Sequence, residues 1–187
     1  MTDYSGNFSN CSIEPTIRCM ATVGTGAKDS QLTELSGRHF LIAQLVAGGV
    51  EVAMPIRDRG IDLIAYLDLS AETNRFLACP IQMKASKEAR FGVEQKYEKI
   101  SNLLITFVWH LENPTKTRIY ALTYEEAFGM LHSRGHCDTA SWRDKGGYSV
   151  PNPGSSWLEE LEPYRMTAER WRSRITTATN SSQRARL

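Results

Sequence analysis

Two apolar segments joined by a polar turn constrain the fold of this 187-residue chain more than any other feature. Residues 60–66 read Gly-Ile-Asp-Leu-Ile-Ala-Tyr, and residues 76–86 read Phe-Leu-Ala-Cys-Pro-Ile-Gln-Met-Lys-Ala-Ser. Both segments mix β-branched, aromatic and aliphatic residues, and the join at residues 70–74 is a turn-like Ser-Ala-Glu-Thr-Asn. The pair therefore predicts a β-hairpin.

The hairpin is expected to gather three polar side chains at one end of a sheet. Asp62 opens the first strand, whereas Gln82 and Lys84 end the second and share a face because they are two residues apart. In an antiparallel hairpin, the start of one strand lies beside the end of the other. A carboxylate and an amide oxygen can hold a hard cation such as Mg²⁺. A neighbouring lysine can orient a water or offset phosphate charge.

This arrangement resembles the PD-(D/E)XK nuclease superfamily, in the variant whose second acid is glutamine. The resemblance covers about residues 31–131, and residues 36–52 look like the first helix and first strand of that family. It implies a restriction-endonuclease-like α/β fold with a three-layer core. In that fold a mixed sheet of four or five strands is flanked by helices, and here a C-terminal helical extension would follow.

The resemblance also implies roles for individual residues. Asp62 would be the metal-ligand aspartate, Gln82 would take the second-acid position and Lys84 would be the catalytic lysine. The backbone carbonyl of Met83 would add a ligand to Mg²⁺ or Mn²⁺. The implied activity is that of a metal-dependent deoxyribonuclease, with DNA as the partner.

One position departs from the family pattern. The family often carries a glutamate on its first helix, just after a glycine, and this chain has Arg38 there. Glu34 lies one helical turn earlier on the same face. Glu34 either replaces the missing catalytic acid or is a solvated acid favoured by the helix dipole.

The departure at Arg38 and the glutamine at position 82 keep a second interpretation open. In it, the chain is a catalytically degenerate module of the same fold that binds nucleic acid or a protein partner. Three aromatic residues that bracket a glycine- and proline-rich segment are candidates for a partner surface: Trp142, Tyr148 and Trp157.

The net charge of +1 gives no global attraction to nucleic acid, so such a contact depends on a local patch. The candidate contacts are Arg38, Lys87 and Arg90. The last two directly follow the motif, where a phosphate backbone would pass.

Three further features indicate an intracellular, cytoplasmic protein without a membrane partner. The four cysteines form no CxxC pair, which is typical of a reducing compartment. No apolar run approaches the ~18 residues that a membrane-spanning helix needs. The N-terminus lacks the pattern of a signal peptide. A homodimer is left open.

The chain divides into a predicted flexible arm (residues 1–28), a nuclease-like core (29–135), and a Pro/Gly loop plus C-terminal helices packed on the same domain (136–187). The first helix is expected to begin at Asp29 or Ser30 and end at Gly48. The further expected elements are a strand at 50–56, a polar loop at 85–93, a charged helix at 94–102, a buried strand at 103–109 and a strand at 118–122. A capping box at 123–126 predicts a helix that ends near 135, another is expected at 156–159, and residues 176–187 should fray.

Overall fold

A five-stranded mixed sheet forms the centre of the protein in the computed structural model, which describes residues 30–57, 59–68 and 76–184. Its strands, in spatial order, are β1 (Glu51–Ala53), β2 (Leu63–Asp68), β3 (Phe76–Ala85), β5 (Leu104–Trp109) and β6 (Arg118–Thr123). β2 is antiparallel to β1 and β3, β3 is parallel to β5, and β5 is antiparallel to β6. The predicted hairpin strands and mixed sheet are therefore present. The expected N-terminal arm and the turn at 70–74 lie outside the described residues.

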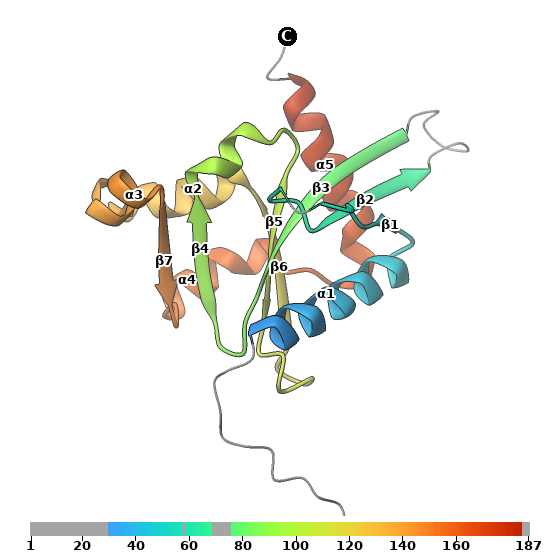
Figure 1. Ribbon diagram of the computed structural model, residues 1–187, viewed down its shortest axis with the longest axis horizontal. Coiled ribbons are helices and arrows are strands. Elements are labelled where there is room, and N and C mark those ends of the chain that lie inside the picture. Colours follow the sequence, from blue (N-terminus) through green and yellow to red (C-terminus); the bar gives the residue numbers. More distant parts are fainter. Residues whose placement is uncertain (1–29, 58, 69–75, 185–187) are drawn as a thin grey trace, which may run out of the picture.

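A second, two-stranded antiparallel sheet pairs β4 (Arg90–Glu94) with β7 (Gly147–Pro151). Figure 1 shows this small sheet on the opposite side of the molecule from β1. Besides three longer helices that cover the central sheet, the described part of the chain has several short ones. They are α3 (Ala140–Lys145), α4 (Ser155–Leu161) and four 3₁₀ turns: η1 (Gln95–Lys99), η2 (His136–Asp138), η3 (Glu162–Tyr164) and η4 (Ala168–Arg170).

Two hydrophobic cores lie on the two faces of the central sheet. Helices α1 (Ser30–Ala47) and α5 (Trp171–Arg184) cover one face, where both contact β3. Helix α2 (Tyr124–His132), β4 and α4 contribute side chains to the core on the other face. The strand β5 is buried along its whole length because its side chains alternate between the two cores. The apolar run at 103–109 is thus a central strand, as predicted.

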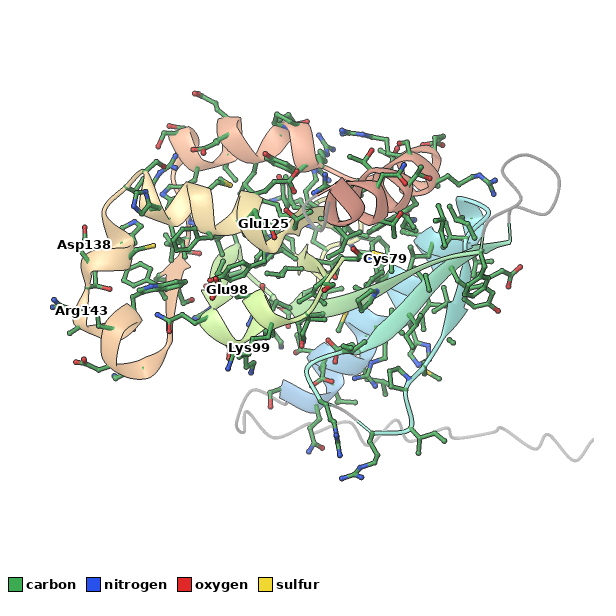
Figure 2. All side chains as sticks on the ribbon, turned by 90° about the horizontal axis from the view of Figure 1, so that it is seen from above. Cys79, Glu98, Lys99, Glu125, Asp138 and Arg143 are labelled. Atoms are coloured by element: carbon green, nitrogen blue, oxygen red, sulfur yellow. The ribbon has the colours of Figure 1, made fainter. Side chains whose placement is uncertain are left out.

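Strand β3 buries one face and presents its polar side chains on the other. Leu77, Cys79, Ile81 and Met83 are buried in the core beneath α1 and α5. The Sγ of Cys79 contacts the carbonyl oxygen of Asn102 at 3.1 Å, and burial raises the pKa of this thiol to about 12. Figure 2 shows Cys79 in the interior, close to α5. Cys79 therefore behaves as a small apolar residue.

Helix α1 packs on β3 through a glycine. A Cβ built at Gly37 would lie 2.5 Å from the Cβ of Ala85, so only glycine permits this approach. The buried stripe of the helix is Gly37, Leu41 and Leu45, at intervals of four residues. Leu35 and Val46 lie off this stripe, with exposed fractions of 47% and 58%.

The capping box at the start of α2 is confirmed. The backbone N–H of Glu126 donates to Thr123 Oγ1 at 3.3 Å, and the backbone N–H of Thr123 donates to Glu126 Oε2 at 2.7 Å. The helix then buries Ala127, Met130 and Leu131. The second capping box is wrong, because α4 begins after Gly154 and has no side-chain cap hydrogen bond.

Several other element boundaries differ from those predicted. The polar loop expected at 85–93 contains β4, and the Pro/Gly segment after residue 135 contains α3 and β7. The helix expected at 94–102 is the shorter turn η1, the strand expected at 50–56 is limited to β1, and α5 continues to Arg184 instead of fraying from residue 176. The β4–β7 pairing joins distant segments, so the local pattern of neither segment reveals it.

None of the helices within the described ranges has the length and apolar character needed to cross a bilayer.

Candidate metal and phosphate site

The start of β2 lies beside the end of β3, as the hairpin pattern predicts. Leu63 pairs with Ile81, and the backbone N–H of Asp62 donates to the carbonyl oxygen of Ile81 at 2.9 Å. This pairing sets the side chain of Asp62 against the residues that follow Ile81 on β3. Asp62 and Gln82 are therefore brought together, with Lys84 two residues farther along the same face of β3.

The carboxylate of Asp62 is buried and hydrogen-bonded to β3. Its Oδ2 accepts from Gln82 Nε2 at 2.6 Å and from the backbone N–H of Met83 at 2.6 Å. Gln82 Nε2 also donates to the carbonyl oxygen of Met83 at 3.2 Å. The amide nitrogen of Gln82 thus occupies a position between a carboxylate oxygen and a main-chain carbonyl oxygen.

This cluster has the donor chemistry of a site for a hard cation. A half-turn of the Gln82 amide about its last side-chain bond places Oε1 where Nε2 now lies, next to Asp62 Oδ2 and the Met83 carbonyl. Mg²⁺ is commonly bound through one or two carboxylates, and it completes its coordination with water and substrate phosphates. A set of one carboxylate, one amide and one carbonyl fits that pattern. Across residues 30–184, apart from the undescribed positions, no group of three or more His, Cys, Asp or Glu side chains is arranged to hold a metal.

Arg38 connects the first helix to this cluster. Its Nη2 lies 2.5 Å from Glu34 Oε1 and 3.8 Å from Asp62 Oδ1. The side chain of Glu34 is 54% exposed, and it reaches the Asp62 region through Arg38. The guanidinium of Arg38 therefore occupies the space between the two acids and partly offsets the charge of Asp62.

Lys84 forms an ion pair that the sequence patterns did not predict. Its Nζ lies 2.8 Å from Glu94 Oε1, which also accepts a 2.9 Å hydrogen bond from the hydroxyl of Tyr97. Glu94 Oε2 lies 2.7 Å from the Nζ of Lys96. Burial alone would raise the pKa of Glu94, but hydrogen bonds from the two lysines and the tyrosine lower it to about 2. Glu94 is therefore a carboxylate at neutral pH.

Glu94 and Tyr97 were not predicted as site residues, because residues 94–102 were expected to form a charged helix. The signal was the apolar stretch Phe91-Gly92-Val93, which ends directly at Glu94. Such a stretch is typical of a strand that ends at a polar residue. This interpretation of the stretch would have predicted an acid, Glu94, at the end of a strand.

Lys84 borders a recess in the surface. A cavity of about 260 Å³ is lined by Lys84, Ser86, Arg90, Glu94, Ser141, Gly147, Tyr148 and Ser149, among others. A second cavity of about 300 Å³ shares Ala85, Ser86 and Arg90 with the first and adds Lys87. Arg90 thus lines both cavities, Lys84 lines the first and Lys87 lines the second. Arg38 lines neither of them and lies beside Asp62 instead.

The aromatic residues proposed as a partner surface lie mostly inside the protein. Trp142 and Trp157 are each only 7% exposed and belong to the core beside α2. The expectation that they form a surface for a partner is wrong, because their rings fill the space between α2, α4 and the small sheet. Tyr148 is half-buried and lines the first cavity.

Comparisons with known protein families, with characterised proteins and with solved structures gave no match to this chain.

Proposed function

We propose that this chain is a metal-dependent nuclease of the PD-(D/E)XK type that hydrolyses phosphodiester bonds in DNA. The observation that carries the proposal is the convergence of Asp62, Gln82 and Met83, whose polar atoms lie 2.6–3.2 Å apart. The five-stranded mixed sheet with helices on both faces supports a restriction-endonuclease-like core.

The residues of the cluster divide the chemistry between them. Asp62, the side-chain oxygen of Gln82 and the carbonyl of Met83 would hold Mg²⁺ or Mn²⁺. A bound cation of this kind polarises a phosphate and lowers the pKa of a coordinated water. The protein contributes the fixed position of these oxygens, because Asp62 is hydrogen-bonded to the backbone of β3.

Lys84 supplies positive charge beside the cluster. An ammonium group has three N–H donors, so the ion pair with Glu94 does not use all the donors of Lys84. A second hydrogen bond from Lys84 would orient the attacking water or stabilise the negative charge that develops on the phosphate. Arg90 shares a cavity with Lys84 and a second cavity with Lys87, and the neighbouring phosphates of a strand would contact these two side chains.

One observation favours a second candidate, the catalytically degenerate binding module. Arg38 stands 3.8 Å from Asp62 Oδ1, at the position where the family often carries an acid. A guanidinium there stabilises the carboxylate without any metal ion. In this alternative the second cavity, lined by Lys87 and Arg90, would bind nucleic acid, but no bond would be cleaved.

Nicking of supercoiled plasmid DNA by the purified full chain, with Mg²⁺ or Mn²⁺, tests the proposal. Lys84→Ala should lower the rate by ~10²–10³, by analogy with loss of one oxyanion-hole donor. Asp62→Asn should also be impaired but partly rescued by high Mn²⁺, because its defect is in metal binding. Lys99→Ala, which alters an exposed lysine on η1, is the matched control and should cleave as the parent does.

Metal binding measured without DNA separates the two candidates. The nuclease proposal expects Mn²⁺ binding by the parent and its loss in Asp62→Ala. DNA binding with neither Mn²⁺ binding nor cleavage would support the degenerate module. Cleavage that is equal in the parent, Lys84→Ala and Asp62→Asn would be contamination and would overturn the nuclease proposal.

A further inference from the structure

The ammonium group of Lys84 is held from two sides. Its Nζ lies 2.8 Å from Glu94 Oε1 and 5.3 Å from the centroid of the Tyr97 ring. The hydroxyl of Tyr97 donates to the same Glu94 oxygen at 2.9 Å. Each of the three side chains therefore contacts the other two, so none of them moves without breaking two contacts.

The groups that hold Lys84 stand on rigid parts of the fold. Glu94 is the last residue of β4, where it pairs with Gly147 of β7, and its extended backbone (φ −121°, ψ 137°) leads directly into η1. Tyr97 is only 2% exposed and belongs to the core beside α2. A buried ring and a paired strand end position a ligand group more accurately than an exposed loop does.

The charges of this group leave Lys84 able to act on an anion. Glu94 is paired with Lys84 through Oε1 and with Lys96 through Oε2, so three charged groups carry a net charge of +1. The centroid of the Tyr97 ring lies 5.3 Å from the Nζ of Lys84 and 5.2 Å from the Nζ of Lys96. The Lys96 side chain is 61% exposed, whereas that of Lys84 is 28% exposed and borders the recess.

We infer that Glu94 and Tyr97 are positioning residues for Lys84, holding its ammonium group beside the Asp62–Gln82–Met83 cluster before any substrate binds. The catalytic consequence of this inference rests on the proposed nuclease function; the immobilisation of Lys84 does not. A lysine has a flexible four-carbon stem and loses conformational freedom when its head group is fixed. If the lysine is already fixed in the folded protein, this loss of conformational freedom does not add to the activation free energy.

Chemical labelling of the lysines tests the immobilisation without any use of activity. The folded full chain is treated briefly with acetic anhydride, and the modification rate at each lysine is read by mass spectrometry. The variants are Glu94→Gln, which keeps the shape but removes the charge, and Tyr97→Phe, which keeps the ring but removes the hydroxyl. The matched control is Glu98→Gln, since Glu98 is an exposed acid of η1 (Figure 2).

The modification rate of Lys84 should be several-fold higher in Glu94→Gln than in the parent. The increase in Tyr97→Phe should be smaller. Lys87 and Lys99 should be modified at unchanged rates in each variant, and Lys84 should be unchanged in Glu98→Gln. Equal Lys84 rates in the parent and in both Glu94→Gln and Tyr97→Phe, with unchanged circular dichroism, would overturn the inference.

Kinetics then test the catalytic consequence. In an active parent, Glu94→Gln should lower kcat about 10- to 100-fold with little change in KM, because a misplaced catalytic group affects the transition state more than substrate binding. Faster labelling with an unchanged kcat would overturn the catalytic part of the inference. If the parent cleaves no DNA but Lys84 is still labelled faster in the variants than in the parent, the proposed function is refuted and the immobilised lysine remains established.

Discussion

The backbone N–H of Met83 donates a 2.6 Å hydrogen bond to Oδ2 of Asp62. The main-chain pairing of β2 with β3 ends where the N–H of Asp62 donates to Ile81. Beyond that point, the N–H of Met83 on β3 donates to the side chain of Asp62 instead of to a backbone carbonyl of β2. Asp62 is 9% exposed and Met83 is 4% exposed, so this donor has little access to water. One carboxylate thus serves both the fold and the proposed site.

Removal of this carboxylate is expected to destabilise the protein. Asp62→Ala should lower the free energy of unfolding by about 1–3 kcal/mol, because it leaves a buried N–H without a partner. Asp62→Asn should cost less, since an amide oxygen still accepts from Met83. Urea denaturation measures both, with the exposed Glu88→Ala as control. An Asp62→Ala protein as stable as the parent would contradict the structural role of this hydrogen bond.

Arg38 should compete with a cation for Asp62. Replacing it in Arg38→Gln removes a positive charge 3.8 Å from Oδ1, so Mn²⁺ should bind about 3- to 10-fold more tightly, on the order of 1 kcal/mol. Isothermal titration calorimetry measures the affinity. Arg143→Gln is the control, because Arg143 lies in α3 at the far end of the molecule (Figure 2). An unchanged affinity in Arg38→Gln would show that this contact does not oppose metal binding.

The close packing of α1 on β3 should depend on the absence of a side chain at Gly37. Alanine favours a helix over glycine by about 1 kcal/mol, yet Gly37→Ala should destabilise by about 1–3 kcal/mol because its Cβ would lie 2.5 Å from that of Ala85. Adding Ala85→Gly should restore part of the loss. Thermal and urea unfolding measure all three proteins.

The control for Gly37 is another helical glycine without close neighbours. A Cβ at Gly129, in α2, would meet no atom within 4 Å. Gly129→Ala should therefore stabilise the protein by about 0.5–1 kcal/mol. If Gly37→Ala also stabilises, the close contact between α1 and β3 does not limit the helix position.

Glu94 should make stability depend on acid pH. Its pKa is lowered from an ordinary 4.5 to about 2, because the hydrogen bonds from Lys84, Lys96 and Tyr97 outweigh the effect of burial. A group with a depressed folded-state pKa contributes stability fully above its unfolded pKa, and this contribution is lost as the pH falls through the folded value. The stability advantage of the parent over Glu94→Gln should therefore be constant above about pH 5 and shrink towards pH 2. Urea midpoints across this range measure it, and an advantage that stays constant down to about pH 3 would contradict the role assigned to this carboxylate.

The local sequence was enough to predict those helices and strands that are stabilised by contacts between residues close together in the chain. The hairpin strands, the apolar strand β5 and the capping box of Thr123 and Glu126 were all predicted, because alternation, continuous apolarity and capping each act over a few residues. The meeting of Asp62 with Gln82 follows from the same local rule, since antiparallel pairing sets the start of one strand beside the end of the next.

Only the tertiary structure decided which distant groups complete the site. β4 pairs with β7, which lies far along the chain, and Glu94 at the end of β4 forms an ion pair with Lys84. Helix α1 faces the sheet through Gly37 because Ala85 allows no larger side chain there, which turns Leu35 outward and sets Arg38 beside Asp62. These contacts depend on how separate elements pack, and the sequence of one element does not contain the shape of its partner.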